Sequence, residues 1–236
     1  MLSIIIPTLN EDKYLPLTLN EIKKQNFDNF EIIISDAGST DKTIEIAKSF
    51  GCKIASGGLP AKGRNEGAKA AQGDLLLFMD ADNIFIPKNF LKQLITEFEH
   101  RNLDCASFPI FIQGDRLDRF LYGIYNLWVE ISQSFMPHAF NSMIIKRELH
   151  QEIEGFDEDI KLAEDHAYIR KAAKVGKFGF IKTAPIITSN RRFKKEGRLM
   201  GYLKYILAGI YIFLFGNIKT DIFKYRFGYD QTKDKK

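Results

Sequence analysis

The chain has 236 residues and a mass of 27.1 kDa, which fits one large domain or one domain with a short appendage. Its hydrophobic content of 45% and charged content of 27% are ordinary for folded soluble chains, so disordered, collagen-like and low-complexity classes are excluded. Cys52 and Cys105 are too few for a disulfide framework and lack the spacing of a structural zinc site, which favours a reducing cytoplasm. The amino terminus also lacks the basic and apolar segments of a signal peptide.

The net charge of +4 is distributed unevenly. Residues 191–236 contain 12 Lys and Arg against 4 Asp and Glu, a balance of +8, so residues 1–190 carry −4. The same segment is rich in Tyr and Phe, and cations mixed with aromatic residues suit a membrane interface or a nucleic acid. Composition alone does not choose between these partners.

The first half of the chain alternates predicted strands with predicted helices. Short apolar runs predict strands at residues 2–6, 31–35, 52–55 and 75–79. Apolar residues at helical spacing predict helices between them, at about 15–22, 41–47 and 63–71. Strand and helix in repeated alternation predict parallel strand pairing with right-handed crossovers.

The second half is less regular. Its predicted elements are a helix at 87–101, a strand at 105–112, a helix at 117–134, a strand at 141–145 and a helix at 164–175. We therefore expect an α/β domain over residues 1–193, with a mostly parallel sheet flanked by helices.

An apolar run at 199–215 follows this domain. As a helix it would be about 25 Å long, at the short end of what spans a bilayer. A buried core helix is one interpretation. Cations on both sides of the run favour a membrane role, either as an interfacial helix or as a short span. Residues 194–236 are thus expected to associate with the inner face of the cell membrane, and an apolar core in this tail argues against a nucleic-acid partner.

Polar residues follow three of the predicted strands. Thr8, Asn10 and Glu11 follow the first strand, Asp36, Gly38 and Ser39 follow the second, and Asp80, Ala81 and Asp82 follow the fourth. In parallel sheets ligands bind beyond the carboxyl ends of the strands, and acidic loops that meet there repel one another unless a cation lies among them. Asp80 and Asp82 suit Mg²⁺ or Mn²⁺, which in turn bind phosphate oxygens. The dinucleotide-binding and P-loop glycine motifs are missing from the sequence.

Five motifs in order extend from Ser3 to about Arg192. They are Ile4-Ile5-Ile6-Pro7-Thr8-Leu9-Asn10-Glu11, Ser35-Asp36-Ala37-Gly38-Ser39-Thr40-Asp41, Gly63-Arg64-Asn65-x-Gly67, Gly73-Asp74-x₅-Asp80-Ala81-Asp82 and Gly155-Phe156-Asp157-Glu158-x₅-Glu164-Asp165. With these motifs the chain resembles the inverting family 2 glycosyltransferases of GT-A fold.

The resemblance implies a nucleotide-diphospho-sugar donor, Mn²⁺ or Mg²⁺ bound by Asp80 and Asp82, and a general base in the pair Glu164 and Asp165. It implies nucleotide contacts from Thr8, Glu11, Asp36 and Arg64, within a binding set that also includes Pro7, Asn10, Gly38, Ser39, Lys62, Asp80, Ala81, Arg191 and Arg192. Many relatives have a second aspartate where this chain has Ala37, so the contacts of that loop are expected to differ.

The residue types fit these roles, and each has a plainer alternative. Arg64 after a glycine-rich loop suits an anion, or is a solvated surface arginine. Glu164 and Asp165 can complement a helix dipole, but beside a sugar nucleotide Asp165 is the preferred base and Glu164 would orient a hydroxyl. Arg191 and Arg192 would stabilise the departing diphosphate or anchor lipid headgroups.

Three further residues are interpreted as structural. His138 lies where relatives shape the acceptor pocket, yet a structural role is favoured, and His166 is expected on a helix surface. Trp128 is expected in core or membrane-facing packing. The acceptor is expected to be lipid-linked or a glycan; transfer to a polyprenyl phosphate, which needs no base, and nucleotide-sugar binding without turnover are the alternatives.

Overall fold

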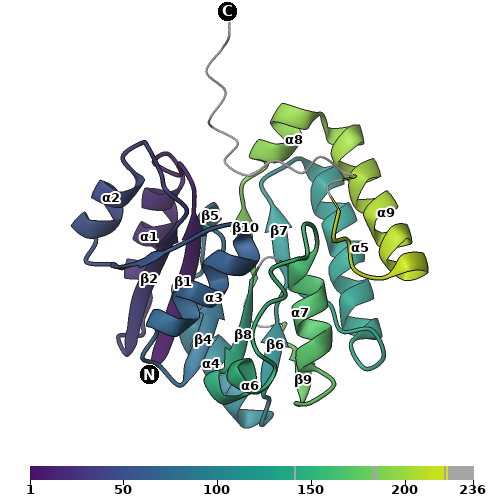
Figure 1. The fold of residues 1–236 in the computed structure, drawn as a ribbon. Coiled ribbons are helices and arrows are strands. Elements are labelled where there is room, and N and C mark those ends of the chain that lie inside the picture. Colours follow the sequence, from purple (N-terminus) through teal and green to yellow (C-terminus); the bar gives the residue numbers. More distant parts are fainter. Residues whose placement is uncertain (141, 183–184, 221, 223–236) are drawn as a thin grey trace, which may run out of the picture.

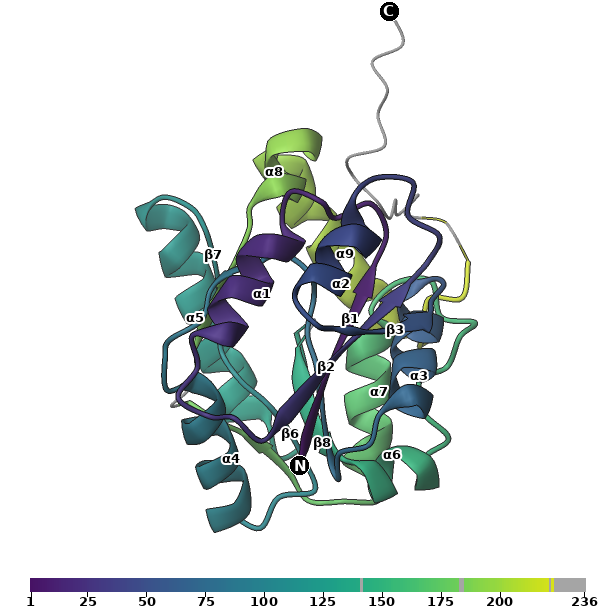
Figure 2. The ribbon, with the colours of Figure 1, turned by 90° about the vertical axis from the view of Figure 1, so that its left-hand side faces the viewer.

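A seven-stranded sheet with helices on both faces forms the centre of the computed structural model, which describes residues 1–140, 142–182, 185–220 and 222 (Figures 1 and 2). The strand order is β3-β2-β1-β4-β8-β6-β9. The strands are β1 (Leu2–Thr8), β2 (Phe30–Asp36), β3 (Lys53–Ser56), β4 (Leu75–Phe78), β6 (Cys105–Ser107), β8 (Met143–Lys146) and β9 (Phe178–Phe180). From β3 to β4 every pairing is parallel, and β8 is antiparallel to both β4 and β6. The mostly parallel α/β sheet is as predicted.

The helices cover both faces of this sheet, and a smaller sheet lies beside it (Figure 1). The helices are α1 (Leu15–Lys23), α2 (Thr43–Ser49), α3 (Pro60–Ala70), α4 (Phe90–His100), α5 (Arg116–Ser132), α6 (Arg147–Glu152), α7 (Glu164–Ala172), α8 (Arg191–Glu196) and α9 (Arg198–Phe215). The small sheet has the order β5 (Asn83–Phe85), β10 (Ile186–Thr188), β7 (Ile110–Ile112).

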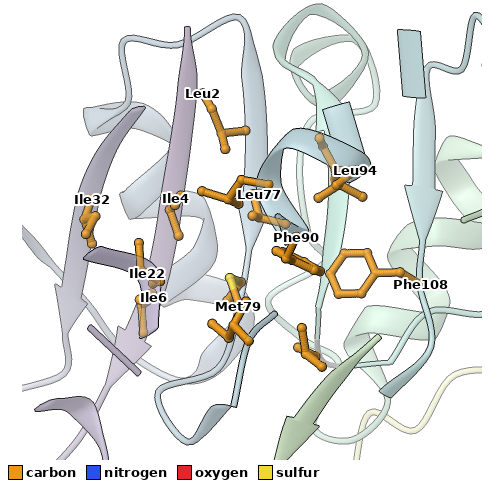
Figure 3. Packing of buried hydrophobic residues seen from close by; sticks show 14 of the residues in the cluster. Leu2, Ile4, Ile6, Ile22, Ile32, Leu77, Met79, Phe90, Leu94 and Phe108 are labelled. Carbon is orange, nitrogen blue, oxygen red and sulfur yellow. The ribbon is translucent and has the colours of Figure 1, made fainter. Parts of the chain in front are cut away.

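Strand β1 is apolar throughout because its two faces pack against different helices. Ile4 and Ile6 lie in one buried cluster with residues of α1 and α4, shown in Figure 3. Ile5 points to the other face, into a cluster with residues of α3, α6 and α7. A strand buried on both faces has no polar alternation, which is why the sequence shows a continuous apolar run.

The structure corrects several predicted elements. The predicted strand at 105–112 is two strands in different sheets, β6 and β7, separated at Phe108 and Pro109. Helix α3 begins at Pro60, earlier than the predicted Gly63, because proline suits the first turn of a helix. The short elements β5, β9, β10, α6 and α8 were not predicted, since three to six residues carry too little periodicity.

Helix α9 does not have the exposure of a core helix. Leu199 is 83% exposed and Phe215 is 72% exposed, and most of the apolar side chains between them are exposed as well. The core interpretation of residues 199–215 is therefore wrong. No helix in the described part of the chain is long and apolar enough to cross a membrane. Lys224 and Arg226, two of the cations that follow the apolar run, lie outside the described residues.

We expect His150 to make the stability of the domain depend on pH. Its ring is buried beside Phe78, and its Nδ1 lies 2.7 Å from the Tyr168 hydroxyl. Burial lowers the pKa of His150 to about 4. The unfolded chain therefore binds more protons than the folded chain between about pH 6.5 and pH 4, so stability is complete above this window and falls as the pH decreases through it.

We expect His150→Gln to lessen this pH dependence. The histidine contributes about 2 kcal/mol to the difference in unfolding free energy between about pH 7 and pH 5. Urea unfolding at the two pH values should give a smaller difference for the variant than for the wild type. His100→Gln, on the exposed end of α4, controls for the loss of a histidine. An unchanged difference in His150→Gln would contradict this role.

Candidate active site

The carboxyl ends of β1, β2 and β4 lie at one edge of the sheet, because these neighbouring strands are parallel. The acidic side chains there are Glu11, Asp36, Asp80 and Asp82, which we call the acidic edge. The loop after β1 turns at Asn10, which has a φ of 55°. Asn10 joins two loops: its N–H donates to Ser39 Oγ at 2.8 Å and its Oδ1 accepts from the Thr40 N–H at 2.7 Å.

Asp36 organises the loop that follows β2. Its Oδ1 accepts from Thr8 Oγ1 at 2.9 Å and from Ser39 Oγ at 2.5 Å. Its Oδ2 accepts from the N–H groups of Gly38 and Ser39 at 2.9 and 2.7 Å. Gly38 has a φ of 92°, a conformation that an L residue rarely adopts, so the glycine is required for this turn. The predicted residues of the first two loops are thus held as one unit.

Asp82 is held by residues from the far end of the chain. Its Oδ1 accepts from Thr188 Oγ1 at 3.1 Å and its Oδ2 accepts from Ser189 Oγ at 2.7 Å. Arg191 Nε lies 3.1 Å from the same Oδ2. These three residues reach Asp82 because β10 pairs with β5, which directly follows Asp82.

Arg191 joins Asp82 to Glu11. Its Nη2 donates to Glu11 Oε1 at 2.7 Å and its Nη1 donates to Oε2, so the pair is bidentate. The guanidinium also lies 4.8 Å from the centre of the Tyr14 ring. Burial raises the pKa of Glu11 to about 7, against the opposing effect of Arg191. Asp82 and Glu11 raise the pKa of Arg191 although burial opposes its charge.

Arg64 makes the second bridge, from Asp80 to Glu164. Its side chain is 2% exposed, its Nη2 donates to Asp80 Oδ1 at 3.0 Å, and its Nη1 donates to Glu164 Oε1 at 2.6 Å. The guanidinium lies 5.5 Å from the Phe156 ring centre. The alternative of a solvated surface arginine is wrong, because α3 begins at Pro60 and places Arg64 in its buried second turn.

Asp165 lies beside this bridge at the start of α7. The preceding Ala163 has a φ of 60°, a left-handed conformation that is strained for a non-glycine residue. Burial raises the pKa of Asp165, and Arg64 acts in the opposite direction. His166 was expected on the helix surface, but its Nδ1 is buried, burial lowers its pKa to about 4, and its ring packs against His138 at 5.2 Å between centres.

Some of the predicted site residues contact one another, whereas others do not. Arg64 forms one group with Asp80 and Glu164, Arg191 forms a second with Glu11 and Asp82, and Asp36 bonds within its own loops. Lys62 is exposed on α3. Arg192 donates from Nη1 to the Tyr205 hydroxyl at 2.8 Å, which directs it to α9. The acidic loops were expected to need a cation, and in this structure Arg64 and Arg191 supply positive charge there.

The sequence reasoning missed three residues that contact these groups. Thr188, Ser189 and Tyr14 lie outside the five sequence motifs. The run of hydroxyl residues just before Arg191 was the available signal, since short polar side chains after an apolar strand often bind a functional group. Nothing in the sequence showed that this group is the Asp82 carboxylate.

Asp80 and Asp82 suit a divalent cation by the chemistry of their donor atoms. Carboxylate oxygens bind Mg²⁺ and Mn²⁺, which usually complete their coordination with water and substrate phosphates. Asp80 keeps 32% of its side chain exposed. Among the described residues, no group of three or more His, Cys, Asp or Glu side chains is arranged to hold a metal ion without other ligands. Two carboxylates supply only part of the coordination shell of such a cation.

Comparison with known proteins identifies a family that matches more than half of the chain. The family described as "Glycosyl transferase family 2" matches residues 3–156. The poly(ribitol-phosphate) beta-N-acetylglucosaminyltransferase TarS of Staphylococcus aureus is 28% identical over 183 residues, which are 72% of this chain and 32% of TarS. The chain therefore spans about a third of the length of this relative.

Two solved structures share the fold. The structure of S. aureus TarS 1–349 with UDP-GlcNAc has a TM-score of 0.66 at 23% identity, covering 80% of this chain and 58% of that one. The mannosyltransferase PcManGT from Pyrobaculum calidifontis, in complex with GDP-Man and Mn²⁺, has a TM-score of 0.68 at 18% identity, covering 88% and 60%.

Proposed function

Because the chain belongs to glycosyl transferase family 2 and is a glycosyltransferase, we propose that it moves one sugar from a nucleotide-diphospho-sugar to a hydroxyl acceptor with inversion at the anomeric carbon. The observation that supports this most strongly is the Arg64 bridge. It connects Asp80, on the edge that would bind the diphosphate, to Glu164, next to the proposed base Asp165. In this proposal one buried side chain would fix the distance between donor and base.

The donor would bind along the acidic edge. The loops after β1 and β2, joined by Asn10 and Asp36, would receive the nucleoside, and the diphosphate would lie near Asp80 and Asp82. UDP, UDP-GlcNAc and GDP-Man are bound by similar structures, which supports a nucleotide-sugar donor. The excess of carboxylates over arginines at this edge favours an additional cation.

Asp80 and Asp82 would hold Mn²⁺ or Mg²⁺, which when bound neutralises charge on the departing nucleoside diphosphate. Arg191, now paired with Asp82 and Glu11, would share its contacts with the phosphates. Asp165 would take the proton of the acceptor hydroxyl as the oxygen attacks the anomeric carbon and the diphosphate leaves.

The acceptor would be a lipid-linked or glycan molecule at the inner face of the cell membrane. The basic C-terminal segment supports the membrane location, since residues 191–236 carry a net charge of +8. A polyprenyl phosphate is the alternative acceptor, because its oxygen is already ionised.

The proposal is tested by incubating the full chain with UDP- and GDP-sugars and lipid extracts, and measuring both nucleoside diphosphate release and sugar transfer. We expect release from one donor class, accelerated by Mn²⁺ or Mg²⁺. Binding of a donor without any release would indicate a nucleotide-sugar-binding protein instead, and the proposal of turnover would be wrong.

We expect Asp82→Asn to remove the effect of the metal on donor affinity. A neutral amide is a poorer ligand for a hard dication, so the affinity for nucleoside diphosphate in Mn²⁺ should fall by about tenfold or more. Competition against a fluorescent nucleoside diphosphate measures this. Asp28→Asn, an exposed carboxylate at the opposite edge of the sheet, is the matched control. If Mn²⁺ strengthens binding equally in both variants, Asp82 does not hold the metal.

A further inference from the structure

Helix α5 exposes its apolar stripe and buries its polar one. The exposed apolar side chains recur at helical spacing and continue past the end of the helix; they are Leu117, Phe120, Ile124, Leu127, Trp128, Ile131 and Phe135. The inward face carries Asp118, Asn126 and Ser132, all buried, together with Val129. A helix that packs on a protein core normally has the reverse arrangement.

Helix α9 also exposes an apolar stripe. Leu199, Leu203, Ile206, Ile210 and Leu214 are exposed and follow one another at intervals of three and four residues, and Leu207 is exposed beside Ile206. Among the described side chains of α9, the small Ala208 is buried, and Gly201 packs against Phe193. A single exposed leucine needs no explanation, but two helical stripes of this length indicate an interaction surface.

The two helices touch at their amino-terminal turns, on the side of the molecule away from β1 to β3 (Figure 1). Arg198 on α9 pairs with Asp115 at 2.8 Å and with Asp118 at 2.9 Å, and the Tyr202 hydroxyl donates to Asp118 Oδ1 at 2.9 Å. Asp115 is the N-cap of α5, and Asp118 completes the capping box by accepting from the Asp115 N–H. We call the two exposed stripes together the α5–α9 surface.

Exposed cations lie at the amino-terminal end of this surface. Arg116 and Arg119 are exposed on α5, and Lys194 and Lys195 are exposed on α8. The acidic residues nearby are paired, Asp115 with Arg198, Glu130 with Lys182 and Glu196 with Lys204. Two copies of so cationic a surface would repel each other, whereas the anionic headgroups of a bilayer would attract it.

We propose that α5 and α9 together form a docking surface for an anionic bilayer, with both helices lying in the membrane interface. The apolar side chains would enter the boundary between headgroups and acyl chains, while the exposed cations of α5 and α8 would contact the headgroups. The sequence assigned membrane contact to residues 194–236 and left it as an alternative for Trp128, Arg191 and Arg192. The exposed stripe of α5 makes the catalytic domain itself part of the surface. Trp128, 46% exposed, has the amphipathic ring favoured at this depth.

Docking in this way brings the proposed base close to the lipid. The inner face of α5 carries Tyr125, whose ring packs on His138, and His138 packs on His166 next to Asp165. A lipid-linked acceptor would thus reach the site from the bilayer side. This consequence rests on the proposed function, whereas the docking rests on exposure and charge; donor turnover without vesicles tests the function separately.

Trp128 is the single tryptophan of the chain and reports on α5 directly. The full chain is mixed with phosphatidylcholine vesicles, with or without phosphatidylglycerol, and with vesicles that contain brominated acyl chains. We expect the Trp128 emission to shift to shorter wavelength and to be quenched by bromine when phosphatidylglycerol is present, and salt should weaken both effects. Ile124→Gln combined with Leu127→Gln should weaken partitioning by at least about tenfold. Leu17→Gln, an exposed leucine on α1, should not.

Other outcomes overturn the proposal. Vesicle flotation without bromine quenching of Trp128 would mean that the C-terminal segment binds alone. A concentration-dependent shift of the emission without vesicles would mean that a second copy of the chain covers α5. An emission that is unchanged under all conditions would mean that α5 meets no bilayer. The wild-type chain suffices for each of these readings, so a variant that fails to fold does not affect them.

Discussion

Replacing Asp165 with asparagine should lower the rate of sugar transfer to a hydroxyl acceptor by roughly 10² to 10⁴, the usual contribution of a general base. Donor affinity should change little, because Asp165 lies next to Glu164 at one end of the Arg64 bridge and the diphosphate would lie near Asp80 at the other. Steady-state rates and donor titrations with the same preparation separate the two effects.

The pH profile gives a second readout of the same group. A base must be ionised, so activity should rise with pH through the pKa of Asp165, which burial raises above the usual aspartate value. Asp159→Asn, a carboxylate that is 81% exposed, is the matched control and should leave the rate unchanged. Near-normal transfer to a hydroxyl by Asp165→Asn would exclude it as the base and direct attention to Glu164. If the acceptor is a phosphate, Asp165→Asn should lower the transfer rate only slightly.

Replacing Arg64 with methionine should have the largest effect on stability. The substitution leaves Asp80 and Glu164 without their shared buried cation, and breaking a buried ion pair costs roughly 3 to 5 kcal/mol. Urea unfolding measures the loss. Lys69→Met on the same helix removes an exposed pair with Glu66 and should leave the free energy of unfolding nearly unchanged.

A double substitution tests whether the unpaired charge is the cause. Arg64→Met with Glu164→Gln removes one of the two stranded carboxylates, so it should be more stable than Arg64→Met alone. If the double variant is no more stable than the single one, the loss comes from packing around Phe156 and not from charge. An Arg64→Met chain as stable as the wild type would contradict the bridge altogether.

The sequence predicted the parallel half of the sheet and the residues at its edge for a physical reason. Strands β1 and β4 are buried on both faces, so each is a continuous apolar run, and their parallel pairing places Glu11 beside Asp80 and Asp82. Hydrophobic periodicity and composition are enough to predict such elements. The bridge of Arg64 to Glu164 was not predictable, because it joins residues 100 positions apart.

The contacts of Asp82 and the orientation of α5 could not be predicted from the sequence either. Thr188 reaches Asp82 across 106 residues through β10, a strand of three residues that has no period of its own. For α5, the sequence shows an apolar stripe but not whether the stripe faces the core. The orientation of α5 depends on whether β7 offers hydrogen-bond partners to the polar face of the helix. It does so at Ile110, whose carbonyl accepts from Asn126 Nδ2 at 3.2 Å.

The most direct test of the account is calorimetric titration of the unmodified full chain with UDP- and GDP-sugars, in Mn²⁺ and in EDTA. We expect one donor class to bind, Mn²⁺ to strengthen this binding, and the matching nucleoside diphosphate to compete with the donor. No binding of either donor class, with or without the metal, would contradict the assignment of the acidic edge as a nucleotide-sugar site. Equal affinity in Mn²⁺ and EDTA would contradict the metal role of Asp80 and Asp82.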